Sequence, residues 1–266
     1  MKFLLTAINA KFIHSNPAIY SLRAGAGEKL QPYVELAEFT INESLESILE
    51  GIWKRQPKVI GFSCYIWNWK LIREILTELP KILPDTEIWL GGPEVTYDGP
   101  GLLREFPQVT GIMVGEGEVT FREVLEQYLR EAETAGQSER QTESDSTEHQ
   151  VADRRGTVAG KSMVERFGQI PGLCLASGYT APRDLTDLTT LPFLYENMEP
   201  FTNRIIYYET SRGCPYRCSY CLSSIDKKVR LRDISVVKRE LQFFLDQNVK
   251  QVKFIDRTFN CDHKHA

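Results

Sequence analysis

Short apolar runs alternate with amphipathic segments through roughly the first 130 residues of this chain. The apolar runs predict buried strands at residues 2–8, 34–40, 58–64, 86–90 and 110–114. Between and after them, apolar residues recur at helical spacing, which predicts helices at residues 17–29, 44–56, 69–82, 100–106 and 118–130. Strands that alternate with helices are typical of a parallel sheet covered on both faces, because each crossover places a helix on one face.

Five such strands predict a doubly wound, flavodoxin-like α/β domain over residues 1–133, with the strand order 2-1-3-4-5. In this architecture, ligands bind beyond the carboxyl ends of the strands. A binding site is therefore expected in the loops that follow residues 8, 64, 90 and 114.

The composition changes after this domain. Residues 134–168 are mostly polar or charged, and we expect a disordered surface insert, because such a stretch cannot bury enough apolar surface to offset the entropy of ordering. Residues 169–203 predict a small hairpin near 170–178 and then an extended connector. A second unit over residues 204–266 predicts a strand at 205–210, a helix at 234–247 and a strand at 251–256.

The chain has 266 residues, 42% of them hydrophobic and 26% charged, which is typical of a soluble globular protein. Its net charge of −4 gives no electrostatic reason to bind nucleic acid or an anionic membrane. No run approaches the ~20 apolar residues that a membrane helix needs, and the N-terminus lacks the features of a signal peptide. We therefore expect a cytoplasmic protein without nucleic-acid or membrane partners, whose six cysteines serve metal or redox chemistry.

Three of the cysteines lie in one loop directly after the predicted strand 205–210, which reads Gly213-Cys214-Pro215-Tyr216-Arg217-Cys218-Ser219-Tyr220-Cys221. Thiolates are the standard protein ligands of iron–sulfur clusters, and close spacing lets one loop wrap a cluster. Three ligands rather than four leave one iron open for chemistry, by the logic that separates catalytic from structural zinc. We predict that Cys214, Cys218 and Cys221 bind a [4Fe–4S] cluster.

The alternative is a structural zinc site, with Cys261, His263 or His265 as the fourth ligand. Zinc ligands usually come as two Cys-x-x-Cys pairs or as a mixture of cysteine and histidine. The spacing of three residues and then two is unusual for zinc, and it favours the cluster.

Cys-x-x-x-Cys-x-x-Cys with an aromatic residue before the last cysteine resembles the radical S-adenosylmethionine (SAM) superfamily. The resemblance implies that residues 204–266 begin a radical SAM (β/α) partial barrel. It also implies that the open iron chelates S-adenosylmethionine, that electron transfer yields a 5′-deoxyadenosyl radical, and that Tyr220 lies near the adenine. Asp256 and Arg257, in FIDRTFN, would then point toward the barrel mouth, or they form a strand-end salt bridge or cap.

Short glycine-containing or polar motifs also stand at four strand ends of the first domain: Asn9-Ala10-Lys11, Gly61-Phe62-Ser63, Gly91-Gly92-Pro93-Glu94 and Gly115-Glu116-Gly117-Glu118. Glycines there permit close backbone approach to a ligand and supply N–H donors. A tight turn explains a single glycine pair equally well, but four motifs on one edge favour a ligand. The expected binding residues are Asn9, Ser63, Gly91, Gly92, Glu94, Gly115 and Gly117.

The segments INAKFIHSNPAIYSLRA, GFSCYIWN, GGPEVTYD, GEGEVTF and ETSRGCPYRCSYC together resemble cobalamin-binding radical SAM enzymes over nearly the whole chain. The resemblance implies that the first domain is of the cobalamin-binding type and holds cobalamin between itself and the barrel. Domains that ligate cobalt use Asp-x-His-x-x-Gly after the first strand, whereas His14 lies in Phe-Ile-His-Ser-Asn-Pro. We therefore expect His14 to make hydrogen bonds at a helix N-terminus. The radical SAM members of this family often lack a histidine ligand to cobalt, so cobalamin remains expected.

Two further groups of residues each have two interpretations. The aromatic residues Tyr65, Trp67 and Trp69 follow the third strand, and they either pack on the corrin or bury against neighbouring helices. Glu116 and Glu118 suggest acid–base chemistry. A position at a helix N-terminus, where carboxylates are favoured by the helix dipole, explains these glutamates more simply.

The resemblance implies methyl transfer to an unactivated carbon of a small molecule or peptide, with an electron donor such as flavodoxin or ferredoxin. Some members of the family instead cyclise, contract rings or attach thiomethyl groups. The alternative function is a non-catalytic cobalamin- or nucleotide-binding module with a structural metal site. Residues 204–266 are far fewer than the roughly 200 of a complete barrel, so we expect the chain to be part of a longer enzyme and inactive alone.

Overall fold

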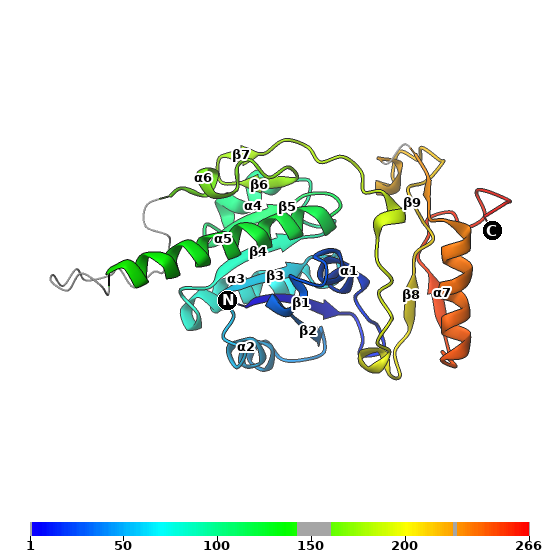
Figure 1. Cartoon of the computed structure of the whole chain (residues 1–266), viewed down its shortest axis with the longest axis horizontal. Helices are drawn as coiled ribbons and strands as arrows, with labels where there is room; N and C mark the ends of the chain where they lie inside the picture. Colours follow the sequence, from blue (N-terminus) through cyan, green and yellow to red (C-terminus); the bar gives the residue numbers. More distant parts are fainter. Residues whose placement is uncertain (1, 143–160, 226–227, 266) are drawn as a thin grey trace. The chain divides into compact units, whose positions relative to one another are not determined.

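The computed structural model describes residues 2–142, 161–225 and 228–265. Its contacts divide the chain into two compact units (Figure 1). The first unit comprises Met1–Lys11 and Ala18–Leu185, and the second comprises Phe12–Pro17 and Thr186–Ala266.

One sheet organises the first unit, with the strand order β2-β1-β3-β4-β5-β6-β7. The strands are β1 (Phe3–Asn9), β2 (Val34–Thr40), β3 (Val59–Ser63), β4 (Glu87–Gly91), β5 (Val109–Met113), β6 (Leu173–Leu175) and β7 (Gly178–Tyr179). The first five pair in parallel, which confirms the predicted order 2-1-3-4-5. The hairpin predicted near residues 170–178 is β6–β7, which pairs antiparallel with β5 and extends the sheet.

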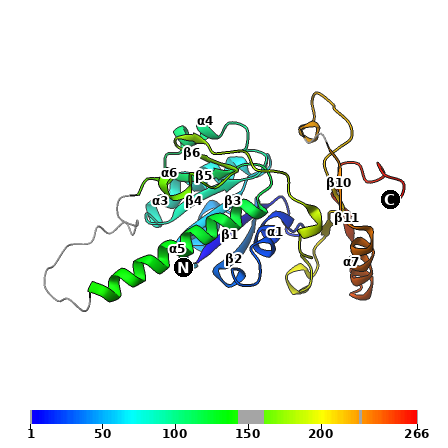
Figure 2. The ribbon, with the colours of Figure 1, turned by 45° about the horizontal axis from the view of Figure 1, so that its top comes forward.

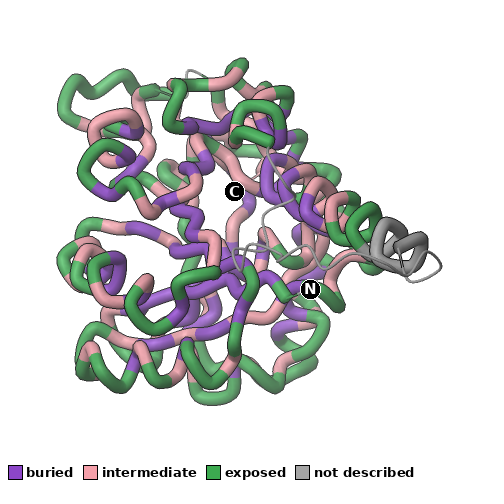
Figure 3. The backbone as a smooth tube through the Cα atoms, turned by 90° about the vertical axis from the view of Figure 1, so that its left-hand side faces the viewer, coloured by how far each residue is buried: buried purple, intermediate pink, exposed green. Residues whose placement is uncertain are grey.

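Helices cover both faces of this sheet (Figure 2). They are α1 (Pro17–Gly25), α2 (Leu45–Trp53), α3 (Trp69–Ile82), α4 (Gly99–Glu105), α5 (Glu118–Thr142) and α6 (Met163–Phe167). Successive side chains of a strand point to opposite faces, so Leu4 and Ile8 of β1 pack with α2, α3 and α4, whereas Phe3, Leu5 and Ala7 pack with α1, α5 and α6. The buried stretches of backbone are purple in Figure 3, and all seven residues of β1 are among them. Burial on both faces explains why the strand sequences read as continuous apolar runs.

A buried ion-pair group, here called the Arg166 cluster, joins α6 to α5 and to the first residue of β4. The Arg166 guanidinium donates to Glu131 at 2.9 Å and to Glu87 at 3.1 Å. Tyr128 donates to Glu87 at 2.6 Å and accepts from Trp89 at 2.8 Å. These contacts tie α6, near the end of the predicted insert, to segments that precede the insert.

The expectation of a disordered insert over residues 134–168 is wrong at both ends. Helix α5 continues to Thr142, and Ser162 caps α6 through a capping box with Glu165. The first stretch is rich in Glu, Ala, Gln and Arg, which favour helix even without an apolar face, and Arg166 of α6 holds the second stretch against the domain. The rest of the predicted insert, 143–160, lies outside the described residues.

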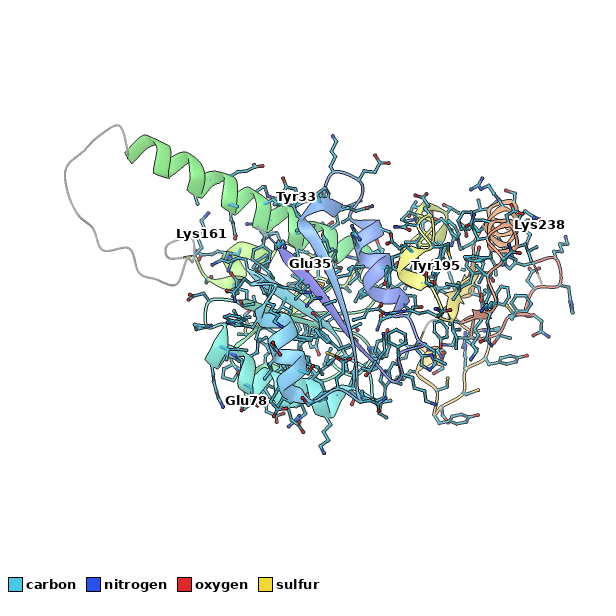
Figure 4. All side chains as sticks on the ribbon, turned by 90° about the horizontal axis from the view of Figure 1, so that it is seen from below. Tyr33, Glu35, Glu78, Lys161, Tyr195 and Lys238 are labelled. Carbon is cyan, nitrogen blue, oxygen red and sulfur yellow. The ribbon has the colours of Figure 1, made fainter. Side chains whose placement is uncertain are left out.

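The edge strand β2 carries charge on its outer side. Glu35, labelled in Figure 4, lies 2.8 Å from Lys2 and 3.2 Å from Arg55. Charged side chains on an edge strand discourage pairing with another chain.

The second unit is built on a parallel β-α-β arrangement, in which β8 (Ile206–Tyr208) pairs with β11 (Val252–Phe254) and α7 (Ile234–Asp246) lies between them in sequence. Strand β9 (Ser211–Arg212) pairs antiparallel with β10 (Arg230–Leu231). On α7, Glu240 accepts from Tyr208 at 2.5 Å and from Arg232 at 2.7 Å. Short 3₁₀ helices occur at Gln31–Tyr33, Leu188–Thr190, Glu199–Phe201 and Leu222–Ser224.

The boundaries of the two units differ from those drawn on the sequence. The predicted region 169–203 is shared: its hairpin belongs to the first unit, and its connector belongs to the second from Thr186 onward. Tyr195 of the connector, labelled in Figure 4, packs on Phe244 of α7. The segment Phe12–Pro17 also joins the second unit, through a bridge between His14 and Ile205. None of the described helices combines the length and apolarity that crossing a membrane requires.

Candidate functional site

Asn68 fastens the carboxyl ends of β1 and β3, two neighbouring strands of the sheet. Its side chain is fully buried, and its Nδ2 donates to the carbonyl oxygens of Ile8 at 3.0 Å and Ser63 at 2.9 Å. Its Oδ1 accepts from the backbone N–H of Tyr65 at 2.8 Å. The predicted site residue Ser63 is thus fixed through its carbonyl group. Asn68 was not singled out from the sequence, although it directly precedes a predicted helix.

Gly92 lets the end of β4 approach the end of β3. Its φ is +109°, and an added Cβ would lie 2.5 Å from the carbonyl oxygen of Cys64. The backbone N–H of Cys64 donates to Gly91 at 2.7 Å. At Gly91 an added Cβ would meet nothing closer than 3.8 Å. Glycine is therefore required at position 92. Glu94, another predicted binding residue, is exposed two residues further along the chain.

The two glycines of the loop after β5 differ in what a side chain would meet, and only Gly115 has a backbone conformation that favours glycine. Gly115 has a φ of +78°, and an added Cβ at Gly117 would lie 2.9 Å from Leu22. Glu118 lies in the first turn of α5, where it is buried and accepts from Ser21 at 2.9 Å. The helix-terminus interpretation of Glu118 is thus confirmed, and the carboxylate joins α5 to α1.

Asn9 is buried at the end of β1, where its amide nitrogen donates to Glu38 at 2.9 Å. Tyr20 of α1 donates to the other carboxylate oxygen of Glu38, also at 2.9 Å. Glu38 and Tyr20 were not singled out from the sequence, because their link to Asn9 spans three elements.

The aromatic residues after β3 divide between the two interpretations. Tyr65 and Trp67 stack with ring centroids 4.4 Å apart, and Trp67 is exposed beside Ile66, which is 81% exposed. Trp69 instead packs edge-on against Phe106 in the core. Other apolar side chains are exposed after neighbouring strands of the same edge: Ile41 after β2 and Tyr97 after β4. An edge with accessible apolar groups and close backbone loops fits a large, partly apolar ligand.

The cysteine loop of the second unit lies between the paired strands β9 and β10. Gly213 has a φ of +93°, and an added Cβ would lie 2.2 Å from the carbonyl oxygen of Lys228 on the returning chain. Cys214 and Cys221 are half-buried, Cys218 is exposed, and all three are free thiols. Tyr220 is 91% exposed. The loop therefore presents three accessible sulfur donors.

The electrostatics of the loop favour a thiolate at Cys221. Hydrogen bonds from the hydroxyl and backbone N–H of Ser223, together with the charge of Arg257, lower the pKa of Cys221. A turn also forms here, in which the N–H of Cys221 donates to the carbonyl oxygen of Cys218 at 3.0 Å. The chemistry of the donors thus fits an iron–sulfur cluster, which thiolates bind.

The described residues contain no group of three His, Cys, Asp or Glu side chains placed to hold a metal ion. The role of Cys214, Cys218 and Cys221 as cluster ligands stays a prediction. The same finding gives no support to a zinc site with Cys261, His263 or His265.

Asp256 follows β11 and reaches back to the segment after β8. Its carboxylate accepts from the N–H of Thr210 at 3.2 Å, from the Thr210 hydroxyl at 2.7 Å and from the Ser211 hydroxyl. Of the two interpretations of Asp256, the structure favours the strand-end cap. Thr210 and Ser211 stand immediately before the cysteine loop, so this cap also fixes the position at which the loop begins.

His14 has a partner that the sequence did not reveal. Its Nδ1 is hydrogen bonded to the Tyr207 hydroxyl, and the two rings stack with centroids 5.8 Å apart. The structure thus assigns His14 a contact with β8, in addition to which the predicted bonds at a helix N-terminus stay a prediction.

The comparisons with known proteins find a family match for the first unit and relatives that cover most of the chain. Residues 4–125 match the B12 binding domain family. The chain is 27% identical to 2-(S-pantetheinyl)-carbapenam-3-carboxylate methyltransferase of Streptantibioticus cattleyicolor, over 89% of this chain and 32% of that protein. It is 26% identical to the cobalamin-dependent radical SAM methyltransferase TokK of Streptomyces tokunonensis, over 77% of this chain and 28% of TokK.

Among solved structures, the cobalamin-dependent S-adenosylmethionine radical enzyme OxsB, with aqua-cobalamin and S-adenosylmethionine bound, shares the fold. Its TM-score is 0.65 at 16% identity, over 96% of this chain and 34% of OxsB. The chain therefore spans about a third of the length of these proteins.

Proposed function

We propose that this chain, whose residues 4–125 match the B12 binding domain family, is the cobalamin- and cluster-binding part of a radical S-adenosylmethionine methyltransferase. The observation that carries the proposal is the accessible three-cysteine loop, which follows β9, shortly after the first strand of a parallel β-α-β unit. The likeness to methyltransferases covers far more of the chain than the B12-binding domain alone.

Cobalamin would bind at the carboxyl edge of the first sheet. Gly92 and Gly117 keep the backbone there close-packed, while Trp67 and Tyr97 leave apolar surface accessible. The Asp-x-His-x-x-Gly motif is absent, and His14 is committed to Tyr207, so this chain would bind the corrin without a histidine ligand from that motif.

The cysteine loop would hold a [4Fe–4S] cluster through Cys214, Cys218 and Cys221, and Tyr220 would contact the adenine of S-adenosylmethionine. When bound, the cluster supplies the electron that cleaves S-adenosylmethionine to a 5′-deoxyadenosyl radical, and cobalamin carries the methyl group to an unactivated carbon. The substrate class is a small molecule or a peptide, the electron donor is a flavodoxin or ferredoxin, and the compartment is the cytoplasm.

Anaerobic reconstitution with iron and sulfide tests the cluster. The chain should bind about four iron atoms per protein, the content of the proposed cluster. Cys218→Ala removes an exposed thiol and should abolish the cluster without loss of folding. The matched control is Cys261→Ser, another cysteine of the same unit. It should keep the iron, whereas a zinc site that uses Cys261 would lose its metal.

Titration with hydroxocobalamin tests the first unit separately. The expected result is a protein-bound corrin spectrum at one equivalent, both in the parent chain and in Cys218→Ala. Corrin binding without iron binding in the parent chain would support the non-catalytic module instead. If neither cofactor binds, the proposed function is wrong.

A further inference from the structure

Two successive residues after β11, Ile255 and Asp256, form hydrogen bonds with the end of β8 and the residues that follow it. The backbone N–H of Ile255 donates to the carbonyl oxygen of Tyr208 at 2.9 Å. The next residue, Asp256, accepts from Thr210 and Ser211, both of which are buried. The position of this segment relative to the start of the cysteine loop is therefore set by hydrogen bonds.

Thr258 lies two residues further along and reaches the first cysteine of the loop. Its Oγ1 is 3.4 Å from the Sγ of Cys214, and both residues are half-buried. The two residues are 44 positions apart in sequence, so the contact depends on the pairing of β8 with β11. By contrast, Ser223, which donates to Cys221, is only two residues from its partner.

The direction of the hydrogen bond follows from the state of the sulfur. A thiol and a hydroxyl can each donate to the other, but a thiolate that binds metal carries no proton and can only accept. With Cys214 as a cluster ligand, the Thr258 hydroxyl is therefore the donor. Hydrogen bonds to the sulfurs are among the factors that set the reduction potential of an iron–sulfur cluster, because a donor stabilises the more negative, reduced state.

We infer that Thr258 is a positioning residue of the cysteine loop, whose hydroxyl donates to Cys214 and raises the reduction potential of the cluster. The inference rests on the proposed function, because it requires the cluster to be bound at Cys214. Asp256 is the group that places Thr258, since it holds the intervening backbone against Thr210 and Ser211.

The test is a redox titration of the anaerobically reconstituted chain, followed by electron paramagnetic resonance. Thr258→Val keeps the shape of the side chain but lacks the hydroxyl, and its midpoint potential should shift to a more negative value. Thr258→Ser keeps the hydroxyl and should titrate at the parental potential. Thr202→Val is the matched control, because the Thr202 hydroxyl is in the same unit but donates to the carbonyl oxygen of Glu199.

The outcomes separate this inference from the proposed function. A parent chain that assembles no cluster overturns both. A parental cluster with equal potentials in all three variants overturns only the role of Thr258. Equal shifts in Thr258→Val and Thr258→Ser, or loss of the cluster in both, would assign Thr258 to packing and contradict the inference. Loss of the cluster in Thr258→Val alone, with a parental potential in Thr258→Ser, supports the need for the hydroxyl.

Discussion

Two groups of buried or half-buried polar contacts tie together distant parts of this chain, and they lie at opposite ends of strands. The Arg166 cluster stands at the amino end of β4, where it joins α5 and α6 to the sheet. Asp256 stands beyond the carboxyl end of β11, where it holds the residues just before the cysteine loop. In parallel α/β folds, ligands bind at the carboxyl ends. The first group is thus placed to act on stability alone, and the second to act on a bound group as well.

The cysteines follow the same division. Cys64 and Cys174 are buried in the sheet unit, and burial raises the pKa of both thiols. The loop cysteines are accessible, and the pKa of Cys221 is lowered. A raised pKa in an apolar core keeps a thiol protonated and inert, whereas a lowered pKa favours the thiolate that binds metal. One residue type therefore serves packing in the first unit and, on the proposed function, binds metal in the second.

Removing Arg166 is the strongest way to test the amino end of this comparison. Arg166→Ala leaves the carboxylates of Glu87 and Glu131 mostly buried without their cation, and such a loss costs about 3–5 kcal/mol of unfolding free energy. Denaturant unfolding followed by circular dichroism measures it. The control Lys161→Ala, an exposed residue labelled in Figure 4, should change stability by less than about 0.5 kcal/mol.

The cofactor titrations should not respond to the same variant. At low denaturant and low temperature, folded Arg166→Ala should bind hydroxocobalamin as the parent chain does. Weak corrin binding by Arg166→Ala, measured where the variant is fully folded, would contradict the separation of the two strand ends.

At the carboxyl end of the sheet, Gly92→Ala should affect stability and binding together. The added Cβ would lie 2.5 Å from a backbone oxygen at a φ of +109°, and such strain costs on the order of 1–3 kcal/mol. Because the loop then moves, the affinity for hydroxocobalamin should also fall. Gly91→Ala is the neighbouring control, since its Cβ meets only ordinary contacts and stability should be kept. Equal destabilisation by the two substitutions would show that the close approach at Gly92 is not the cause.

Asp256→Ala tests the corresponding position in the second unit. Thr210 and Ser211 are buried donors that would lose their acceptor, and an unsatisfied buried group costs about 1–3 kcal/mol. We expect lower iron content after reconstitution, with corrin binding unchanged. Asp246→Asn, on the exposed end of α7, serves as the control and should keep parental iron. Full iron content in Asp256→Ala would show that the loop does not depend on this cap.

The sequence predicted the sheet well because its strands are buried on both faces, and β2 and α3 were placed to the residue. It failed at both ends of the predicted insert because apolar burial was the criterion. Helix propensity extends α5 through residues 134–142, and an ion pair between residues 35 apart holds α6 against the domain. Asn68 and Asp256 each have partners that are distant in sequence, Ile8 at 60 residues and Thr210 at 46, so local pattern could not assign their roles. The assignment of the loop cysteines to a cluster rests on their spacing and stays a prediction.

The smallest expected effect concerns the cysteines themselves. In the chain without its cluster, the lowered pKa of Cys221 means that its thiolate persists to a lower pH than that of an ordinary cysteine, whose pKa is about 8.5. Alkylation by iodoacetamide, read by mass spectrometry across pH, should therefore reach half its maximal rate at a lower pH than it does for a cysteine in an unfolded peptide. Ser223→Ala should move the midpoint upward, because the hydroxyl donor is the largest cause of the lowering. Cys64 is the internal reference: its thiol is buried and its pKa is raised, so it should react only when the chain is unfolded. If Cys64 and Cys221 reacted alike in the folded chain, the division of the cysteines between packing and chemistry would fail.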